Sequence, residues 1–491
     1  MGFAPDMAAK RAELTPDALA FLDHSTGRNW TFAQVNAEAA AVAGGLLGLG
    51  LEQGARVAIL CHNRAEFFIA LFACQKAGLI LCPLNWRQPD AELRPLLASV
   101  GCSAILHDAA HATLAQALSD GQPCIGFAAQ GGFDLHGPPP PPRQIDDDAP
   151  WYLLFTSGTT GLPKAVIQTP RMAMGNAVNI AQHLGLSSHD STACFLPLFH
   201  TAGINLFTLP VFLWGGHSHV LAKFQPDDLF DLIATGRISH FFGVPAIYQA
   251  FSLHPAIDDV DLTRLRSYAC GGAALPAEVI RFFADRGAVI CNGYGMTETG
   301  PTGFLLDPAA ALARIGSIGK PQTMTEARLS GVPDGQPGEG ELEMRGATVT
   351  PGYFGDPDAT ASAFTPDGWL KSGDVAARDA AGYYTIIDRI KDMYISGGEN
   401  VYPAEVERVL ITHPAILEAA VIGIPHPKWG EVGAAFIIAR PGHDCDTDTL
   451  TDWCRARLAG YKTPKSFHLI DDFPRTAAGK VRKPLLRKML P

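Results

Sequence analysis

The sequence has no Cys-x-x-Cys pair, no uninterrupted apolar run of membrane-spanning length and no basic stretch before its C-terminus. Its ten cysteines are scattered singly, which in a chain of this length favours reduced, partly buried thiols. The apolar residues 204–214 are interrupted by Asn205 and Pro210 and are too few to cross a bilayer. The net charge of −11 argues against nucleic acid as the main partner.

The first ten residues lack the features of a targeting signal. They contain Asp6 and no long apolar stretch, so they do not match a signal peptide, and Asp6 also breaks the myristoylation pattern. We therefore expect a cytoplasmic protein without stable membrane insertion. The sequence leaves the oligomeric state open, including a homodimer.

The composition, 47% hydrophobic and 18% charged, is typical of a soluble globular enzyme with large cores. The first region has an α/β texture: residues 56–60 predict a buried strand and residues 34–47 a helix. Five consecutive prolines, 138–142, precede three aspartates, 146–148. Because proline cannot join the interior of a sheet, we predict an exposed connector there.

The texture changes in the last third of the chain. Residues 316–389 contain short alternating segments punctuated by Gly and Pro, which predicts a small β-rich subdomain. The final 100 or so residues have their own α/β pattern, with a helix expected at 404–410 and a strand at 419–423. We place a domain boundary near Lys391.

Residues 156–164, which read Thr-Ser-Gly-Thr-Thr-Gly-Leu-Pro-Lys, follow an apolar strand and form the most informative segment. Glycine lets backbone N–H groups turn toward a ligand, hydroxyls add donors, and Lys164 adds positive charge. Such a loop suits a polyphosphate. It is not a Walker A loop, because only two residues separate Gly158 from Gly161 and the lysine is followed by alanine.

A second block, residues 292–299, reads Asn-Gly-Tyr-Gly-Met-Thr-Glu-Thr. A tyrosine ring beside glycine, such as that of Tyr294, can stack on an adenine. A carboxylate close to a triphosphate implies a divalent cation, and Mg²⁺ is the hard ion that joins carboxylates to phosphates. Glu298 is therefore the candidate Mg²⁺ ligand. Taken alone, each of these blocks also fits an ordinary turn.

Both blocks, together with residues 271–276, 369–374 and 474–482, resemble the signatures of the AMP-forming, adenylate-forming superfamily of acyl-CoA synthetases, luciferases and peptide-synthetase adenylation domains. The blocks occur in the family's order and cover nearly the whole chain. The resemblance implies an α/β fold in which residues 1–390 form a large N-terminal domain of layered α/β subdomains plus a β-barrel-like subdomain. Residues 391–491 would form a small mobile C-terminal α/β domain.

The resemblance also implies roles for individual residues. It gives catalytic roles to Thr156, His200, Glu298 and Lys480, with Lys480 driving adenylation and Lys391 at the hinge. Asp374 would hold the ribose hydroxyls, because a carboxylate accepts from both. The ATP- and AMP-binding set it implies is Ser157, Gly158, Thr159, Thr160, Gly161, Lys164, Gly272, Ala273, Asn292, Gly293, Tyr294, Gly295, Thr297, Asp374, Ile386 and Arg389.

Further segments resemble those that bind coenzyme A in bacterial aryl-CoA ligases. Two consecutive glycines at 397–398 leave room for a slender pantetheine chain. The implied CoA-binding residues are Arg87, Ser396, Gly397, Gly398, Trp429, Tyr461 and Lys465. They favour a CoA ligase over an enzyme that loads a carrier protein or uses no thiol, which stays the alternative.

The acid-binding side resembles that of acyl- and aryl-CoA synthetases. Phe199 and His200 stand where peptide-synthetase domains place an aspartate, so an ammonium group would be left unpaired. The implied pocket is neutral and Gly-rich, with walls from His200, Thr201, Ala202, Phe242, Gly272, Gly293, Gly295 and Gly300. Glycine at 293 predicts a deep slot. We expect an apolar monocarboxylic acid, either a medium- or long-chain fatty acid or an aromatic acid such as a cinnamate.

The sequence thus predicts an AMP-forming acid–CoA ligase that uses ATP, Mg²⁺ and coenzyme A. The acid would be activated as an acyl-adenylate and then transferred to the CoA thiol. The expected partners are these small molecules, with no nucleic acid.

Overall fold

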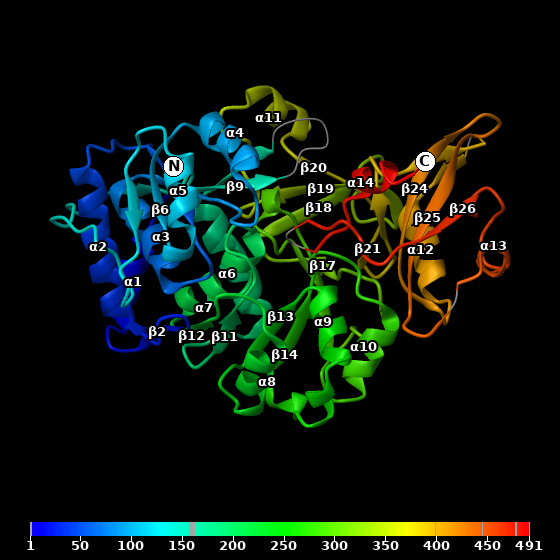
Figure 1. Cartoon of the computed structure of the whole chain (residues 1–491), viewed down its shortest axis with the longest axis horizontal. Helices are drawn as coiled ribbons and strands as arrows, with labels where there is room; N and C mark the ends of the chain where they lie inside the picture. Colours follow the sequence, from blue (N-terminus) through cyan, green and yellow to red (C-terminus); the bar gives the residue numbers. More distant parts are fainter. Residues whose placement is uncertain (1, 157–162, 398, 444, 477–478, 491) are drawn as a thin grey trace. The chain divides into compact units, whose positions relative to one another are not determined.

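The computed structural model describes residues 2–156, 163–397, 399–443, 445–476 and 479–490. Internal contacts group the chain into two compact units (Figure 1). The larger unit contains Met1–Ile315, Pro321–Glu326 and Met344–Leu370, and the smaller unit contains Gly316–Lys320, Ala327–Glu343 and Lys371–Pro491. The functional boundary near Lys391 stays a prediction.

The first sheet of the larger unit has six strands in the order β10-β9-β5-β4-β6-β7. All neighbours pair in parallel except β9 and β10, which form an antiparallel hairpin. The strands are β4 (Arg56–Leu60), β5 (Ile80–Pro83), β6 (Cys102–His107), β7 (Cys124–Gly126), β9 (Tyr152–Thr156) and β10 (Lys164–Gln168). Its helices are α2 (Phe32–Gly48), α3 (Ala65–Ala77), α4 (Asp90–Val100) and α5 (Ala112–Leu118).

The second sheet of this region has nine strands in the order β17-β16-β15-β14-β13-β11-β12-β2-β3. They are β2 (Leu19–Asp23), β3 (Asn29–Thr31), β11 (Ser191–Cys194), β12 (His217–Val220), β13 (His240–Gly243), β14 (Ser267–Cys270), β15 (Ile290–Tyr294), β16 (Phe304–Leu305) and β17 (Lys320–Pro321). The accompanying helices are α6 (Pro170–Leu184), α7 (Thr208–Trp214), α8 (Pro226–Ala234), α9 (Pro245–Ser252) and α10 (Ala277–Ala284).

Helix α3 forms the centre of the largest hydrophobic core. All of its residues, Ala65–Ala77, are buried, including the polar Glu66, Gln75 and Lys76 near its ends. Phe68 stacks on Phe21 of β2 at 5.1 Å, and Phe72 stacks on Phe212 of α7 at 4.7 Å. Helix α3 therefore joins the cores beneath the two sheets.

Short elements flank these sheets. At the N-terminus, β1 (Phe3–Ala4) pairs with β8 (Ile145–Asp146), and α1 (Met7–Leu14) packs on α2. Four of the five prolines at 138–142 are exposed and lie outside any sheet, as the connector prediction requires. The connector runs close to α2, because a Cβ at Gly44 would collide with the carbonyl of Pro138.

The β-rich region contains a four-stranded sheet in the order β18-β19-β20-β21. Its strands are β18 (Thr325–Leu329), β19 (Gly338–Gly346), β20 (Leu370–Arg378) and β21 (Tyr384–Arg389), with α11 (Pro357–Ala363) between β19 and β20. The alternating texture of residues 316–389 correctly predicted strands here.

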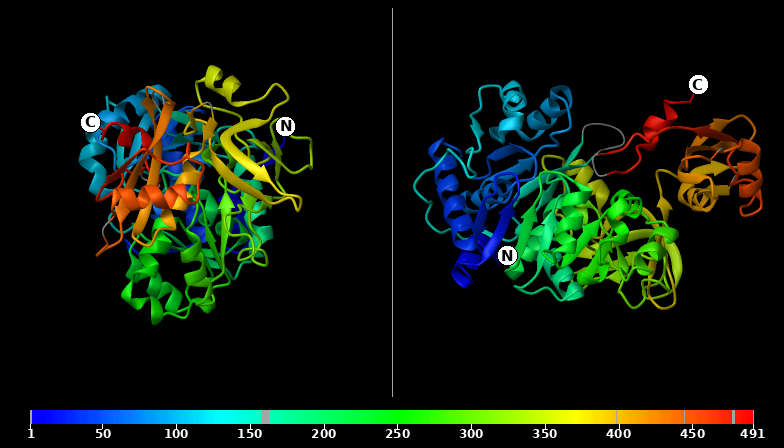
Figure 2. Two further views of the ribbon diagram at one scale, coloured as in Figure 1. Left: turned by 90° about the vertical axis from the view of Figure 1, so that its right-hand side faces the viewer. Right: turned by 60° about the horizontal axis from the view of Figure 1, so that its bottom comes forward.

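The C-terminal part of the smaller unit is a five-stranded sheet in which β23, β22, β25 and β24 are successive neighbours and β26 pairs with β25. Helix α12 packs on β24. Two further views show this C-terminal region in orange to red (Figure 2). The strands are β22 (Tyr394–Ser396), β23 (Glu399–Val401), β24 (Ile416–His426), β25 (Gly430–Ala439) and β26 (Ser466–Leu469), and the helices are α12 (Pro403–Ile411), α13 (Thr447–Arg455) and α14 (Lys483–Arg487). Among the described residues, no helix is long and apolar enough to cross a membrane.

Candidate active site

The hairpin of β9 and β10 carries the predicted phosphate loop. Thr156 and Lys164 face each other as the last pair of the ladder, and the Thr156 hydroxyl lies 3.4 Å from the Lys164 carbonyl oxygen. The predicted loop residues Ser157, Gly158, Thr159, Thr160 and Gly161 lie outside the described residues. The antiparallel pairing therefore holds the two ends of the loop side by side.

Glu298 and Lys164 lie against the same tyrosine, Tyr353. The Tyr353 hydroxyl donates to Glu298 Oε1 at 3.0 Å, and the Lys164 ammonium lies 4.8 Å from the centre of the Tyr353 ring. Burial, followed by the neighbouring Glu298 carboxylate, raises the pKa of Tyr353, so the phenol stays a donor. Thr350 N–H also donates to the Glu298 carbonyl at 2.8 Å.

No motif in the sequence marked Tyr353, which follows β19 in a loop. Its role becomes visible only when the fold brings it beside Glu298, 55 residues away in the chain. The predicted phosphate lysine and the predicted metal-ligating glutamate are thus joined through one aromatic side chain.

The carboxyl ends of the parallel strands β14 and β15 hold the predicted adenine segment. Gly272 and Ala273, which follow β14, are exposed, and Gly272 has a φ of +86° that favours glycine. Asn292 in β15 is 8% exposed. Its Oδ1 atom is buried without a hydrogen-bond partner among the described residues. A buried amide oxygen in this state is suited to accept from a ligand N–H group.

Two glycines of the second block, and Gly300 directly after it, are constrained by close neighbours or by backbone conformation. A Cβ at Gly295 would collide with the Pro301 carbonyl, and Gly300 has a φ of +67°. A Cβ at Gly293 would lie 2.9 Å from Leu305 Cδ2, because Gly293 and Leu305 are cross-strand partners in β15 and β16. The Leu305 side chain thus occupies the space beside Gly293 in which we expected an open slot for the acid.

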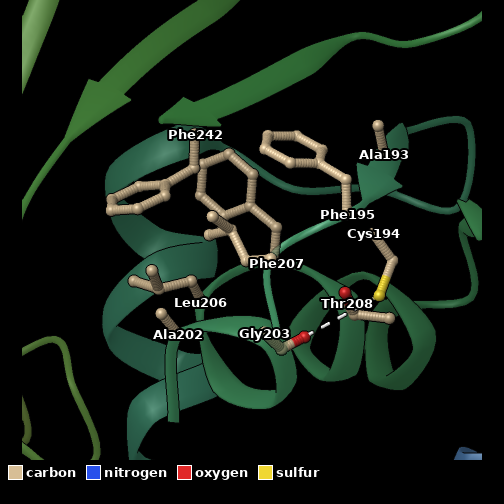
Figure 3. Close-up of a pocket in the computed structure, with 10 residues that line it drawn as sticks. Ala193, Cys194, Phe195, Ala202, Gly203, Leu206, Phe207, Thr208 and Phe242 are labelled. Atoms are coloured by element: carbon tan, nitrogen blue, oxygen red, sulfur yellow. Dashed lines mark hydrogen bonds between the residues drawn. The ribbon is translucent and has the colours of Figure 1, made fainter. Parts of the chain in front are cut away.

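Two predicted acid-pocket residues, Ala202 and Phe242, line one small cavity of about 10 Å³ (Figure 3). Figure 3 shows Phe242 beside Phe207, with ring centres 6.0 Å apart. The remaining lining residues are Ala193, Cys194, Phe195, Leu196, Gly203, Leu206 and Thr208. This volume holds about one water molecule, so the cavity itself does not contain an acyl group.

His200 and Thr201 begin the segment that leads into this cavity. The His200 ring lies 4.9 Å from the Phe199 ring, and the Arg87 guanidinium lies 5.9 Å from the centre of the same Phe199 ring. Thr201 is buried and accepts a hydrogen bond from Asn205 Nδ2 at 3.0 Å. The structure thus brings predicted acid-side and CoA-side residues of the larger unit to one aromatic side chain.

The smaller unit contains the predicted ribose contacts. Asp374 in β20 and Arg389 in β21 are cross-strand partners, and Arg389 Nε lies 3.1 Å from Asp374 Oδ1. Ile386 also lies on β21, where it pairs with Ala376 of β20. Tyr294 and Thr297 lie in the larger unit. Lys391 lies in the turn that follows the end of β21.

Two of the predicted CoA-binding residues meet at the start of β25. The Gly397 N–H donates to the Trp429 carbonyl at 2.8 Å, and a Cβ at Gly397 would lie 3.1 Å from Trp429 Cε3. Trp429 is 42% exposed, so part of its side chain is accessible to a ligand. Tyr461 and Lys465 are also exposed, Ser396 is buried, and Gly398 lies outside the described residues.

The backbone of Lys480 is hydrogen-bonded to Thr476. Thr476 N–H donates to the Lys480 carbonyl at 2.7 Å, and Lys480 N–H donates to Thr476 Oγ1 at 3.1 Å. Arg475, next to Thr476, forms an ion pair with Glu418 at 2.6 Å. These contacts position the backbone of Lys480 within the smaller unit.

The order of these segments matches known proteins over most of the chain. A family model described as AMP-binding enzyme matches residues 8–354, and a model of the AMP-binding enzyme C-terminal domain matches residues 405–480. The chain belongs to the AMP-binding enzyme family. The resemblance that the sequence blocks indicated is thereby confirmed.

Relatives and a solved structure of this family cover almost the full length. Feruloyl-CoA synthase from Amycolatopsis sp is 40% identical, covering 98% of this chain and 97% of the relative. Long-chain-fatty-acid–CoA ligase FadD13 from Mycobacterium tuberculosis is 32% identical, with the same coverage. O-succinylbenzoate coenzyme A synthetase (MenE) from Bacillus subtilis, solved with ATP and magnesium ion, is 30% identical with a TM-score of 0.88, covering 99% of this chain and 100% of that one. The predicted α/β fold class is confirmed.

Proposed function

We propose that this protein is an AMP-forming acid–CoA ligase for an apolar monocarboxylic acid, acting in the cytoplasm. The carboxylate oxygen attacks the α-phosphorus of ATP, pyrophosphate leaves, and a mixed anhydride forms. The CoA sulfur then attacks the acyl carbon, AMP leaves, and the thiol proton passes to solvent. The observation that carries the proposal is the near full-length similarity to CoA ligases of this family.

The nucleotide-binding part of the proposal rests on the larger unit. The orphaned Oδ1 of Asn292 suits the exocyclic amino group of adenine, and the positive φ of Gly272 suits close approach of a ring to backbone. Thr156 and Lys164 stand at the two ends of the phosphate loop. In the smaller unit, the Asp374 carboxylate would hold the ribose.

The Glu298 carboxylate fits a magnesium ion. Mg²⁺ in nucleotide sites is bound by one or two carboxylates together with substrate phosphates, and it neutralises phosphate charge when bound. Glu298 is buried and held by Tyr353, whose hydroxyl donates to Oε1. The carboxylate group is thereby oriented. We infer that Glu298 is the protein ligand and that Tyr353 positions it.

Replacing Tyr353 with phenylalanine should slow adenylation by about 10- to 100-fold, because a hydrogen bond to a charged group contributes about 1.5–3 kcal/mol. The Mg²⁺ concentration needed for half-maximal pyrophosphate release should rise. Both quantities are measured by pyrophosphate release with saturating acid while Mg²⁺ is varied.

A matched control is Tyr383→Phe, because Tyr383 also lies under a lysine, Lys320, at 4.5 Å but on the smaller unit. That variant should keep the wild-type Mg²⁺ dependence. If Tyr353→Phe keeps it as well, Tyr353 does not position Glu298.

The acid class is inferred from the neutral residues around the predicted pocket. An amino acid or a dicarboxylate would bring a second charge without a partner into this environment. Feruloyl-CoA synthase is the more similar of the two named relatives, at 40% against 32% for FadD13. We therefore place aromatic acids with an unsaturated side chain first and fatty acids second.

Leu305 should set the depth of the acid pocket on the β16 side, because its side chain occupies the space that a side chain at position 293 would take. Leu305→Ala should raise the relative kcat/KM by about tenfold for acids that are about two methylenes longer, because each buried methylene contributes about 0.8 kcal/mol. The measurement is a kcat/KM series over acids of increasing length. Leu312→Ala, at a leucine that is 49% exposed, is the control. An unchanged length profile would place the pocket away from Leu305.

Trp429 should bind CoA rather than take part in adenylation. Its exposed indole is suited to stack on the CoA adenine, and one such stack contributes about 1–3 kcal/mol. Trp429→Ala should raise the KM for CoA about tenfold or more and leave pyrophosphate release from acid and ATP nearly intact. Trp453→Ala is the control, because its indole Nε1–H is bonded to the Val409 carbonyl in the same unit. Equal loss of both half-reactions would make Trp429 a structural residue.

The decisive experiment is a pyrophosphate-release screen with and without CoA. The acids are ferulate, cinnamate, benzoate, indoleacetate, fatty acids of graded length, amino acids and malonate. Formation of a CoA thioester from an aromatic or fatty acid supports the proposal. Pyrophosphate release that never leads to a thioester would favour the alternative, an enzyme that loads a carrier protein.

A further inference from the structure

A second group of chemically active side chains lies in the larger unit, at the carboxyl ends of β4 and β6. His62 follows β4. Asp108 follows β6 and caps the short turn Ala109–His111, and His111 is the last residue of that turn. Because β4 and β6 are parallel neighbours, their carboxyl ends meet at one edge of the sheet. None of these three residues was assigned to the acid–CoA ligase reaction from the sequence.

The donor atoms of the three side chains converge. His111 Nδ1 lies 2.5 Å from Asp108 Oδ1, and His62 Nδ1 lies 3.4 Å from Asp108 Oδ2. One donor atom from each residue can be chosen so that all three lie within 4.8 Å of one another. In a tetrahedral zinc site with bonds of about 2.0–2.1 Å, donor atoms lie roughly 3.3 Å apart. Small side-chain rotations therefore bring this set to ligand spacing.

Backbone bonds hold the carboxylate in place. Asp108 accepts the His62 N–H at 2.9 Å and the His111 N–H at 3.1 Å. The bond from the His111 N–H caps the short turn. Capping needs only the Asp108 carboxylate and a backbone N–H group, so it does not explain the two imidazole rings. His62 follows a different strand, β4, yet its ring faces the same carboxylate. The turn after β6 does not explain this placement.

The three side chains differ in their access to solvent. The His62 side chain is 31% exposed, which gives an entry path, whereas the other two are nearly buried.

We propose that His62, Asp108 and His111 form a site for a divalent transition metal of the zinc class, separate from the magnesium position at Glu298. Two imidazoles and one carboxylate are nitrogen and oxygen donors that suit Zn²⁺, Co²⁺ and Ni²⁺ better than Mg²⁺ or Ca²⁺. Three protein ligands leave at least one coordination position for water. Trp86 covers the site, with its ring centre 4.5 Å from that of His62 and 5.8 Å from that of His111.

Trp86 also gives the site a spectroscopic reporter. Co²⁺ bound to the two imidazoles would lie close to the indole and quench its fluorescence. The Arg87 guanidinium lies 4.8 Å from the centre of the same Trp86 ring. A bound metal would thus add positive charge next to a residue that we propose for CoA binding.

The test uses the full-length protein, treated with a chelator and then titrated with Zn²⁺ by calorimetry and with Co²⁺ by absorption and fluorescence. The wild type should bind one equivalent of Zn²⁺ to this site and show a Co²⁺ absorption band. His62→Gln and His111→Gln should weaken binding by about tenfold or more, since even outer-shell changes cost about 10–100-fold in metal affinity. Asp108→Asn should do the same while retaining a side chain that caps the turn.

Two controls separate this site from general binding to surface histidines. His136 also pairs with a carboxylate, Glu38, at 3.0 Å, so His136→Gln should leave the affinity unchanged. Trp86→Phe should abolish the Co²⁺-dependent quenching at this site and keep the Zn²⁺ affinity. Unchanged melting temperatures would establish that the variants fold. The proposal is overturned if the wild type does not bind Zn²⁺, or if the three ligand variants bind it as tightly as His136→Gln does.

Discussion

Replacing Lys480 with alanine should abolish acyl-adenylate formation and leave the second half-reaction largely intact. Negative charge builds on the α-phosphoryl oxygens and on pyrophosphate as the carboxylate attacks, and a lysine ammonium stabilises it. Loss of one such electrostatic contact costs about 100- to 1,000-fold in rate. Supplied acyl-adenylate already lacks pyrophosphate, so its reaction with CoA should keep most of its rate.

Each half-reaction of Lys480→Ala should be followed by rapid quench, one from acid and ATP, the other from synthetic acyl-adenylate and CoA. Lys488→Ala is the matched control, because Lys488 is exposed in the same basic C-terminal segment. Lys488→Ala should behave as wild type in both assays. Equal loss of the two half-reactions in Lys480→Ala would show that the lysine has a structural role instead.

Replacing Lys391 with proline should have the opposite effect: adenylate forms and the thioester does not. Lys391 lies in a turn whose following N–H groups, those of Asp392 and Met393, both donate to the Arg389 carbonyl, at 3.1 and 3.2 Å. Proline fixes φ at position 391 and also restricts Ile390 before it. We propose that the C-terminal domain reorients about this position between the two steps, so the variant should be held in one conformation.

The comparison variant is Lys391→Ala, which removes the charge and keeps backbone freedom. It should retain at least a large part of thioester formation, while Lys391→Pro should accumulate adenylate with thioester formation slowed by about 100-fold or more. Acyl-adenylate and acyl-CoA would be quantified over time from the same reaction. Rapid thioester formation by Lys391→Pro would falsify the hinge at this position.

Local signals predicted individual elements well. The helix expected at 34–47 is α2, Phe32–Gly48, and its earlier start follows from the capping box of Thr31 and Gln34. The strand expected at 56–60 coincides with β4, and the helix expected at 404–410 lies within α12. Each of these elements is specified by neighbours in sequence, so short windows contained the necessary information.

Contacts between distant segments could not be predicted in the same way. The position of Tyr353 beside Glu298 and Lys164 depends on how β10 and the loop after β19 come together. The filling of the space at Gly293 by Leu305 depends on the register of β15 and β16. A glycine in a motif indicates that a side chain is absent, but it does not say which neighbour occupies the space.

The wholly buried helix α3 has a consequence for synthesis on the ribosome. Its residues contact Phe21, which is made before the helix, and Phe212, which is made about 140 positions after it. Until α7 has emerged from the ribosome, the side of α3 on which Phe212 packs is not covered, and this apolar side is exposed to water. A nascent chain that stops after the first sheet would therefore expose an apolar surface and aggregate or recruit chaperones. Co-translational folding of this region must wait for both sheets.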